Sequence, residues 1–191
     1  MAIPDYQTVM LPLLNLAADG EEHRLRDAVE VLADHFDLRE DERKELLPSG
    51  SQATFDNRVG WARTYMKKAW IRESPRRGYF RITDQGLQAL EQKPEMINVK
   101  FLEQYPEFLE FKTKSNTKSV TTEIDTAVPT EERTPREMME DAYVTIRRGL
   151  VGELIEQVMH SSPSFFERLV VDLLVRMGYG GTRARQPAHV A

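Results

Sequence analysis

The sequence contains no cysteine among its 191 residues. Disulfides and thiolate zinc sites are therefore excluded, and a reducing, cytoplasmic location is the simplest expectation. No apolar run is long enough to cross a bilayer, so no membrane partner is expected. The apolar stretch at residues 1–18 carries Asp5 and lacks a basic leader, which is typical of an amphipathic helix and not of a signal peptide. The four histidines are too scattered to indicate a metal site.

Basic charge is in the minority, because 26 Lys and Arg stand against 31 Asp and Glu and give a formal net charge of -5 at pH 7. It is concentrated in residues 54–81, where eight Lys and Arg stand against two acidic residues, so this stretch carries +6 and the remainder -11. A basic segment within an acidic chain is typical of a protein that contacts the phosphate backbone of nucleic acid. The alternative is an ordinary solvated charged surface, but the segregation of charge favours DNA.

Hydrophobic periodicity indicates a mainly α-helical protein with a small β-hairpin. Helices are predicted over residues 6–18, 22–36, 40–46, 54–70 and 135–159. Two short strands at 71–73 and 79–82 flank a basic tip at 74–78, and Thr83 is expected to cap a short helix. This order of elements predicts a winged helix-turn-helix domain, against which residues 98–111 should pack.

The chain is expected to divide into four parts. A winged-helix domain over 1–112 is followed by a flexible linker over 113–134, which is rich in Ser, Thr, Lys and Glu and poor in large apolar residues. Helices over 135–181 come next, and residues 182–191 form a tail of different character.

The helix at 54–70 is the expected recognition helix, and its polar face should meet the bases of double-stranded DNA in the major groove. The candidates for base contacts are Asn57, Trp61, Thr64 and Lys68, with Arg76 and Arg77 at the tip of the wing. The predicted DNA-binding residues are Asn57, Arg58, Trp61, Arg63, Thr64, Lys67, Lys68, Arg72, Arg76, Arg77 and Arg81.

Two tryptophans flank the basic part of this helix. Trp61 falls on the polar face, where it either contacts DNA or packs against residues 98–111, and the sequence favours neither alternative. Trp70, beside Ile71 at the helix end, is expected in the core.

Two stretches resemble one protein family. Residues 55–69 (FDNRVGWARTYMKKA), 75–83 (PRRGYFRIT) and Gly86 are similar to the N-terminal domain of Mrr-like type IV restriction endonucleases. Residues 163–170 (PSFFERLV) resemble the start of the nuclease domain of the same family. The resemblance implies a winged-helix DNA-binding domain, a linker and an α/β nuclease of the PD-(D/E)xK class, acting on modified, for example methylated, DNA.

The same resemblance implies a divalent metal such as magnesium in the full-length family nuclease, held by carboxylates beyond the glycine-rich turn at 178–181. Residues 182–191 contain no carboxylate, so we expect no cofactor and no cleavage by this chain alone, with the nuclease core truncated. A reading-frame shift or a premature stop is the hypothesis for this loss of pattern. Glu167 is a weak catalytic candidate, and a solvated helix glutamate beside Arg168 is the favoured interpretation.

The last helical segment presents a broad apolar face. Its large apolar residues recur at helical spacing: Phe165, Phe166, Leu169, Val170, Leu173, Leu174 and Met177. Exposure of this face gives an alternative function, that of an interaction protein docking on an intact homologue or another partner, or self-associating into a homo-oligomer.

Overall fold

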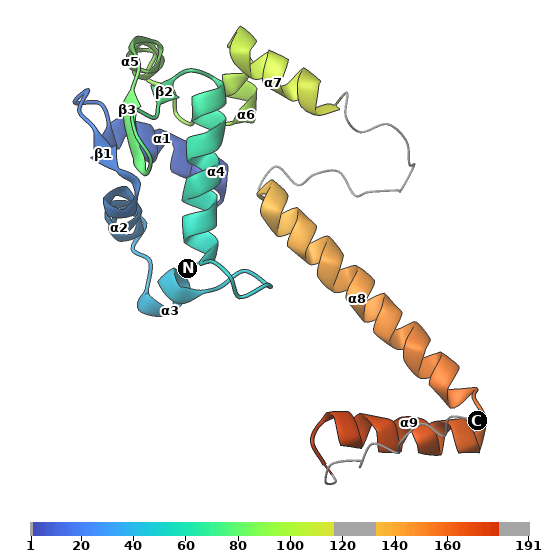
Figure 1. The fold of residues 1–191 in the computed structure, drawn as a ribbon. Helices are drawn as coiled ribbons and strands as arrows, with labels where there is room; N and C mark the ends of the chain where they lie inside the picture. The colour runs from blue at the N-terminus through green and yellow to red at the C-terminus, as the bar shows by residue number, and fades with distance from the viewer. Residues whose placement is uncertain (1, 117–132, 180–191) are drawn as a thin grey trace, which may run out of the picture. The chain divides into compact units, whose positions relative to one another are not determined.

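The computed structural model describes residues 2–116 and 133–179, which belong to two compact units, residues 1–142 and 143–191 (Figure 1). Most of the expected linker and the whole of the expected tail, 182–191, lie outside the described residues. The first four residues of the expected linker, 113–116, instead form the end of a helix.

Most elements of the first unit begin and end close to the positions that periodicity predicts. In chain order they are α1 (Tyr6–Leu16), β1 (His23–Arg24), α2 (Leu25–His35), α3 (Glu40–Lys44), α4 (Thr54–Lys68), β2 (Arg72–Glu73), β3 (Tyr79–Ile82), α5 (Asp84–Glu91), α6 (Val99–Leu102), α7 (Pro106–Asn116) and the start of α8 (Pro135–Met159). The mainly helical fold class is thereby confirmed.

The three strands form an antiparallel sheet in the order β1-β3-β2. β1 was not predicted, because two residues are too short to show a period, and α2 consequently begins at Leu25 and not at Glu22. His23 pairs with Phe80, and their rings lie 5.8 Å apart. The order of helices and strands is consistent with a winged helix-turn-helix domain, in which β2 and β3 form the wing.

The core is built around α1 and α4, which pack against each other (Figure 1). The fully buried side chains at this contact include Val9, Met10 and Leu13 from α1 and Val59, Ala62 and Met66 from α4. Their spacing is helical in both segments, so each helix presents one continuous apolar stripe to the other. This is the stripe that the sequence pattern predicts.

The wing is tied to α5 by a close backbone approach at Gly86. A Cβ atom at this position would lie 2.0 Å from the carbonyl oxygen of Ile71 and 2.6 Å from Cγ1 of Ile82. Thr83 caps α5, as predicted, by accepting a hydrogen bond from the Gly86 N–H at 3.2 Å. Only glycine fits here without displacing the backbone of Ile71 and the side chain of Ile82.

Residues 98–111 pack back on the domain, as expected. Leu102 of α6 and Phe108 of α7 are buried in the core. The ring of Tyr65 on α4 lies 5.8 Å from that of Phe108 and 6.3 Å from that of Phe111. These aromatic contacts place α7 beside the carboxyl-terminal half of α4, where most of the predicted DNA-binding residues of that helix lie.

The second unit comprises the remainder of α8 and α9 (Pro163–Arg176). Ser162 caps α9 through its hydroxyl, and Pro163 occupies the first turn. No residue of α9 is buried, and its apolar side chains are exposed or half-exposed, as the sequence pattern predicts.

Candidate nucleic-acid interface

The exposed basic side chains of the predicted interface lie at the end of α4 and along the β2–β3 hairpin. Lys67 and Lys68 close α4, and Arg76 and Arg77 follow at the hairpin tip, where Gly78 adopts a φ of 81°. Arg76 stacks on the ring of Tyr79, with Cζ 3.6 Å from the ring centroid, and its Nε donates to Glu22 at 3.0 Å. The Arg77 side chain is exposed and has no ion pair to a described residue. It is therefore available to a phosphate group.

Arg81 is exposed but already paired within the sheet. It lies opposite Glu73 in the register of β2 and β3, and its Nε donates to the Glu73 carboxylate at 2.9 Å. This hydrogen bond raises the pKa of the Arg81 guanidinium further. Because Glu73 neutralises it, Arg81 presents less unpaired charge at the surface than Arg77.

Asn57 does not point into solvent, which corrects the expectation for the first turns of α4. Its side chain is 2% exposed, and Nδ2 donates to the Thr134 hydroxyl at 2.7 Å. Thr134 immediately precedes α8, and the first turn of that helix covers the amino-terminal half of α4. A contact across 77 residues of sequence cannot be read from local periodicity.

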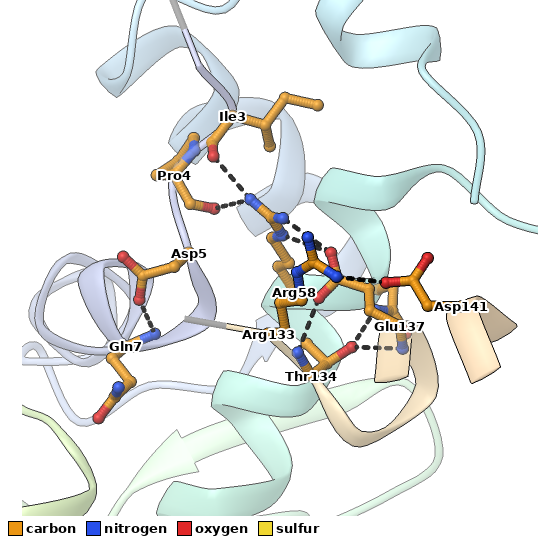
Figure 2. A network of polar contacts seen from close by, with 10 residues as sticks. Ile3, Pro4, Asp5, Gln7, Arg58, Arg133, Thr134, Glu137 and Asp141 are labelled. Atoms are coloured by element: carbon orange, nitrogen blue, oxygen red, sulfur yellow. Dashed lines mark hydrogen bonds and ion pairs between the residues drawn. The ribbon is translucent and has the colours of Figure 1, made fainter. Parts of the chain in front are cut away.

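Arg58 is held in the same network, shown in Figure 2. Its Nε and Nη2 both donate to Oε1 of Glu137, at 2.9 and 2.7 Å, and Nη1 donates to the carbonyls of Ile3 and Pro4 at 2.6 and 3.2 Å. With its hydrogen bonds used internally, Arg58 ties the amino terminus, α4 and α8 together. Asn57 and Arg58 are therefore not part of the exposed basic surface.

The contacts of Asn57 and Arg58 with Thr134 and Glu137, called the lock below, have a partial signal in the sequence. Thr134 and Glu137 form a reciprocal capping box at the start of α8: Oε2 of Glu137 accepts from the Thr134 N–H at 2.7 Å, and the Thr134 hydroxyl accepts from the Glu137 N–H at 3.2 Å. Pro135 occupies the first helical position. The pattern predicts the helix start, but not the helix against which it packs.

The two tryptophans lie in different environments, and for Trp61 the structure shows the packing alternative. Trp61 is half-buried against the core, with its ring 5.9 Å from that of Tyr65. Trp70 is 57% exposed and has a φ of 56°, so the expectation of a core position was wrong. Because α4 ends at Lys68, the chain turns at Trp70 in the left-handed region, and this turn buries Ala69 and Ile71 while directing the indole outward.

Arg63 and Arg72 are less exposed than Lys67 and Lys68. Arg72 is 2% exposed, and its Nε donates to the carbonyl of Arg63 at 2.7 Å. Burial, and secondarily the charge of Arg63, lower the pKa of Arg72 to about 9, and burial also lowers the pKa of Arg63. Thr64 is half-buried and donates to the carbonyl of Gly60 at 2.9 Å. These three side chains were predicted as surface contacts, but they line a recess.

Comparison with known protein families gives a match for the front of the chain. The family described as the Mrr N-terminal domain matches residues 6–92, from α1 through α5. The matched segment, residues 6–92, is called the Mrr N-terminal domain below for its similarity to that family. The Mrr N-terminal domain thus contains the hairpin and the whole of α4, and the lock formed by residues 134–137 lies outside the matched segment.

One relative extends the similarity beyond this domain. The type IV methyl-directed restriction enzyme EcoKMrr of Escherichia coli strain K12 is 30% identical over 189 residues, 96% of this chain. The chain spans 62% of the length of that relative. The comparison with solved structures gave no significant match.

Beyond the Mrr N-terminal domain, Glu167 lies exposed on α9. Within residues 2–116 and 133–179, no three His, Asp or Glu side chains come together as a metal site requires. No helix in the same described ranges is long and apolar enough to cross a membrane.

Proposed function

We propose that the Mrr N-terminal domain binds double-stranded DNA through the end of α4 and the tip of the β2–β3 hairpin. The supporting observation is that Lys67 and Lys68 line the same surface recess as Ser74, the residue with which the hairpin tip begins. Arg76 and Arg77 follow directly and are exposed. Two basic side chains thus line this recess at the end of α4, and two more follow Ser74 within three residues along the chain, on a domain that matches the Mrr N-terminal family.

The charge distribution supports the same proposal. Residues 54–81 carry +6 within a chain whose net charge is -5. Because DNA repels the acidic remainder and attracts the basic segment, the protein should approach DNA with the basic surface first. A helix end and a neighbouring hairpin tip are also the two parts that a winged helix applies to the duplex, one at the groove and one at the flanking phosphates. Since Asn57 and Arg58 are covered, the proposed contact is displaced toward the carboxyl end of α4.

The test is a fluorescence-anisotropy titration of the chain with a labelled duplex at several salt concentrations. Each phosphate contact should lower the logarithm of the binding constant by roughly 0.9 per tenfold rise in salt. Four contacts would give a slope of roughly -3.6. Binding that is absent at low salt, or that does not respond to salt, would contradict the proposal.

We propose methylated duplex DNA as the preferred form, because the similar enzyme from Escherichia coli is methyl-directed by name. Duplexes of one sequence, with and without methylated bases, test this under identical salt conditions. Tighter binding of the methylated duplex supports the assignment, and equal affinity contradicts it without affecting DNA binding itself. The proposal concerns binding and not cleavage.

The exposed apolar residues of α9 favour docking as a second candidate function. Phe165, Phe166 and Leu173 are each about half-exposed, and burying a side chain of this size is worth roughly 1.5–3 kcal/mol. We propose that this face associates with a second copy or with another apolar partner surface. Sedimentation velocity over a range of protein concentrations, with Phe165→Ser and Phe166→Ser variants as controls, tests self-association.

A further inference from the structure

A recess of about 670 Å³ lies between the end of α4, strand β2 and helix α7. Its α4 and β2 side is lined by Arg63, Thr64, Lys67, Lys68, Trp70 and Arg72. The α7 side contributes Glu107, Glu110 and Phe111, of which the two glutamates are exposed. The deepest charges are therefore positive, and the carboxylates stand in solvent at the rim.

The two arginines of this recess have no carboxylate partner within the described part of the chain. Arg72, 2% exposed, donates to neutral oxygens: the carbonyls of Arg63 and Glu73 at 2.7 and 3.1 Å, and the Ser74 hydroxyl at 3.3 Å. The Nε atom of Arg63 is buried and has no hydrogen-bond partner among those residues. Glu73, which also lines the recess, is paired with Arg81.

Arg58, on the same helix, shows the usual solution for a guanidinium at low exposure. Its side chain is 17% exposed, and it is paired with Glu137, whose side chain is 9% exposed. A charge removed from water without such a partner is strongly unfavourable, and a buried donor without an acceptor adds to that cost. Arg72 is thus buried without a carboxylate partner among the described residues, and the partly buried Arg63 beside it has an unbonded Nε, whereas Arg58 is paired with Glu137.

We propose that this recess is a binding site for a phosphate group, and specifically for one phosphodiester of the bound DNA strand. Arg63 and Lys67 would contact its oxygens, with Arg72 supplying charge behind them. The choice of DNA as the source of the phosphate rests on the function proposed above. Trp70 supports a nucleic-acid strand over a free ion, because an exposed indole held at positive φ beside a cationic recess can stack against a sugar or base.

The first arm of the test uses inorganic phosphate and the full chain. The melting temperature is measured with phosphate or chloride at matched ionic strength, and the fluorescence of Trp70 is recorded in a Trp61→Phe background. Phosphate should raise the melting temperature of the unsubstituted chain and alter the Trp70 emission in the Trp61→Phe background. Both responses should be lost in Arg63→Gln and in Lys67→Gln, and retained in Arg26→Gln, an exposed arginine of α2 outside the recess. Equal responses to phosphate in all variants, or no response in any protein including the unsubstituted chain, would overturn the proposed phosphate site.

The second arm uses the DNA titration. Arg63→Gln should make the salt slope shallower by roughly 0.9, equivalent to one phosphate contact, and Arg26→Gln should leave it unchanged. Arg77→Gln should also reduce the salt slope but leave the response to inorganic phosphate intact. This pair of results distinguishes a phosphate contact outside the recess from one inside it. Phosphate binding without any effect of Arg63→Gln on the DNA slope would overturn DNA as the source. A chain that binds phosphate but no DNA would overturn the proposed function and that assignment together.

Discussion

Arg58 and Glu137 join two segments that lie 79 residues apart, with two guanidinium nitrogens bonded to a single carboxylate oxygen at 2.9 and 2.7 Å (Figure 2). The other oxygen of Glu137 caps α8 by accepting from the Thr134 N–H. One carboxylate therefore both starts α8 and fixes that helix against α4. This pair determines which part of α4 remains available to a ligand.

Glu137→Gln should destabilise the first unit by about 1.5–3 kcal/mol, because it removes the charge that two guanidinium donors share at low exposure. Glu40→Gln is the matched control, since Glu40 pairs with Lys44 on the open surface and both side chains are more than three-quarters exposed. Urea unfolding of both variants provides the measurement. Equal midpoints would show that the lock makes no contribution to stability.

Gly86→Ala should destabilise the domain by at least about 2 kcal/mol, because the new methyl group would lie 2.0 Å from the Ile71 carbonyl and overpack the wing against α5. Gly60→Ala is the control within α4, where a Cβ meets no atom within 4 Å and the gain in helix propensity is up to about 1 kcal/mol. Thermal unfolding followed by circular dichroism distinguishes the two. A stable Gly86→Ala variant would contradict the close approach.

Glu140 should make the contact between α8 and the loop at residues 49–52 dependent on pH. The Ser49 N–H donates to Oε2 at 2.9 Å, and this hydrogen bond, followed by that from Arg136, holds the pKa of Glu140 below its ordinary value of 4.5. A lowered folded-state pKa contributes stability that is present above the unfolded value and is lost as pH falls through the folded value. The advantage of the unsubstituted chain over Glu140→Gln should therefore shrink below about pH 4.5. A difference in melting temperature between the unsubstituted chain and Glu140→Gln that stays constant as the pH falls below about 4.5 would contradict the prediction.

The second unit should contribute nothing to the stability of the first. None of the residues of α9 is buried, and its large apolar side chains are exposed or half-exposed. Deleting residues 160–191 should leave the melting temperature of the first unit unchanged and increase solubility. A substantial fall in that temperature would contradict the division into two units.

The sequence predicts the fold better than it predicts the site. Local periodicity finds α8 at its observed bounds, Pro135–Met159, and the capping pattern at Thr83 predicts the start of α5. It cannot predict that Asn57 and Arg58 are covered, because the covering residues are remote in sequence. It also misplaces Trp70, since hydrophobicity alone does not reveal that α4 ends two residues earlier in a left-handed turn.

The most direct measurement compares two variants in the DNA titration. The Lys68→Ala, Arg76→Ala and Arg77→Ala triple variant removes exposed charge from the end of α4 and the hairpin tip, and Asn57→Ala removes a covered polar group from the beginning of α4. We predict that the triple variant loses most of its affinity at low salt and that its salt slope becomes shallower by roughly 2.7, corresponding to three contacts. Asn57→Ala should bind DNA as the unsubstituted chain does. Unchanged binding by the triple variant, or loss of binding in a folded Asn57→Ala variant, would contradict the proposed interface.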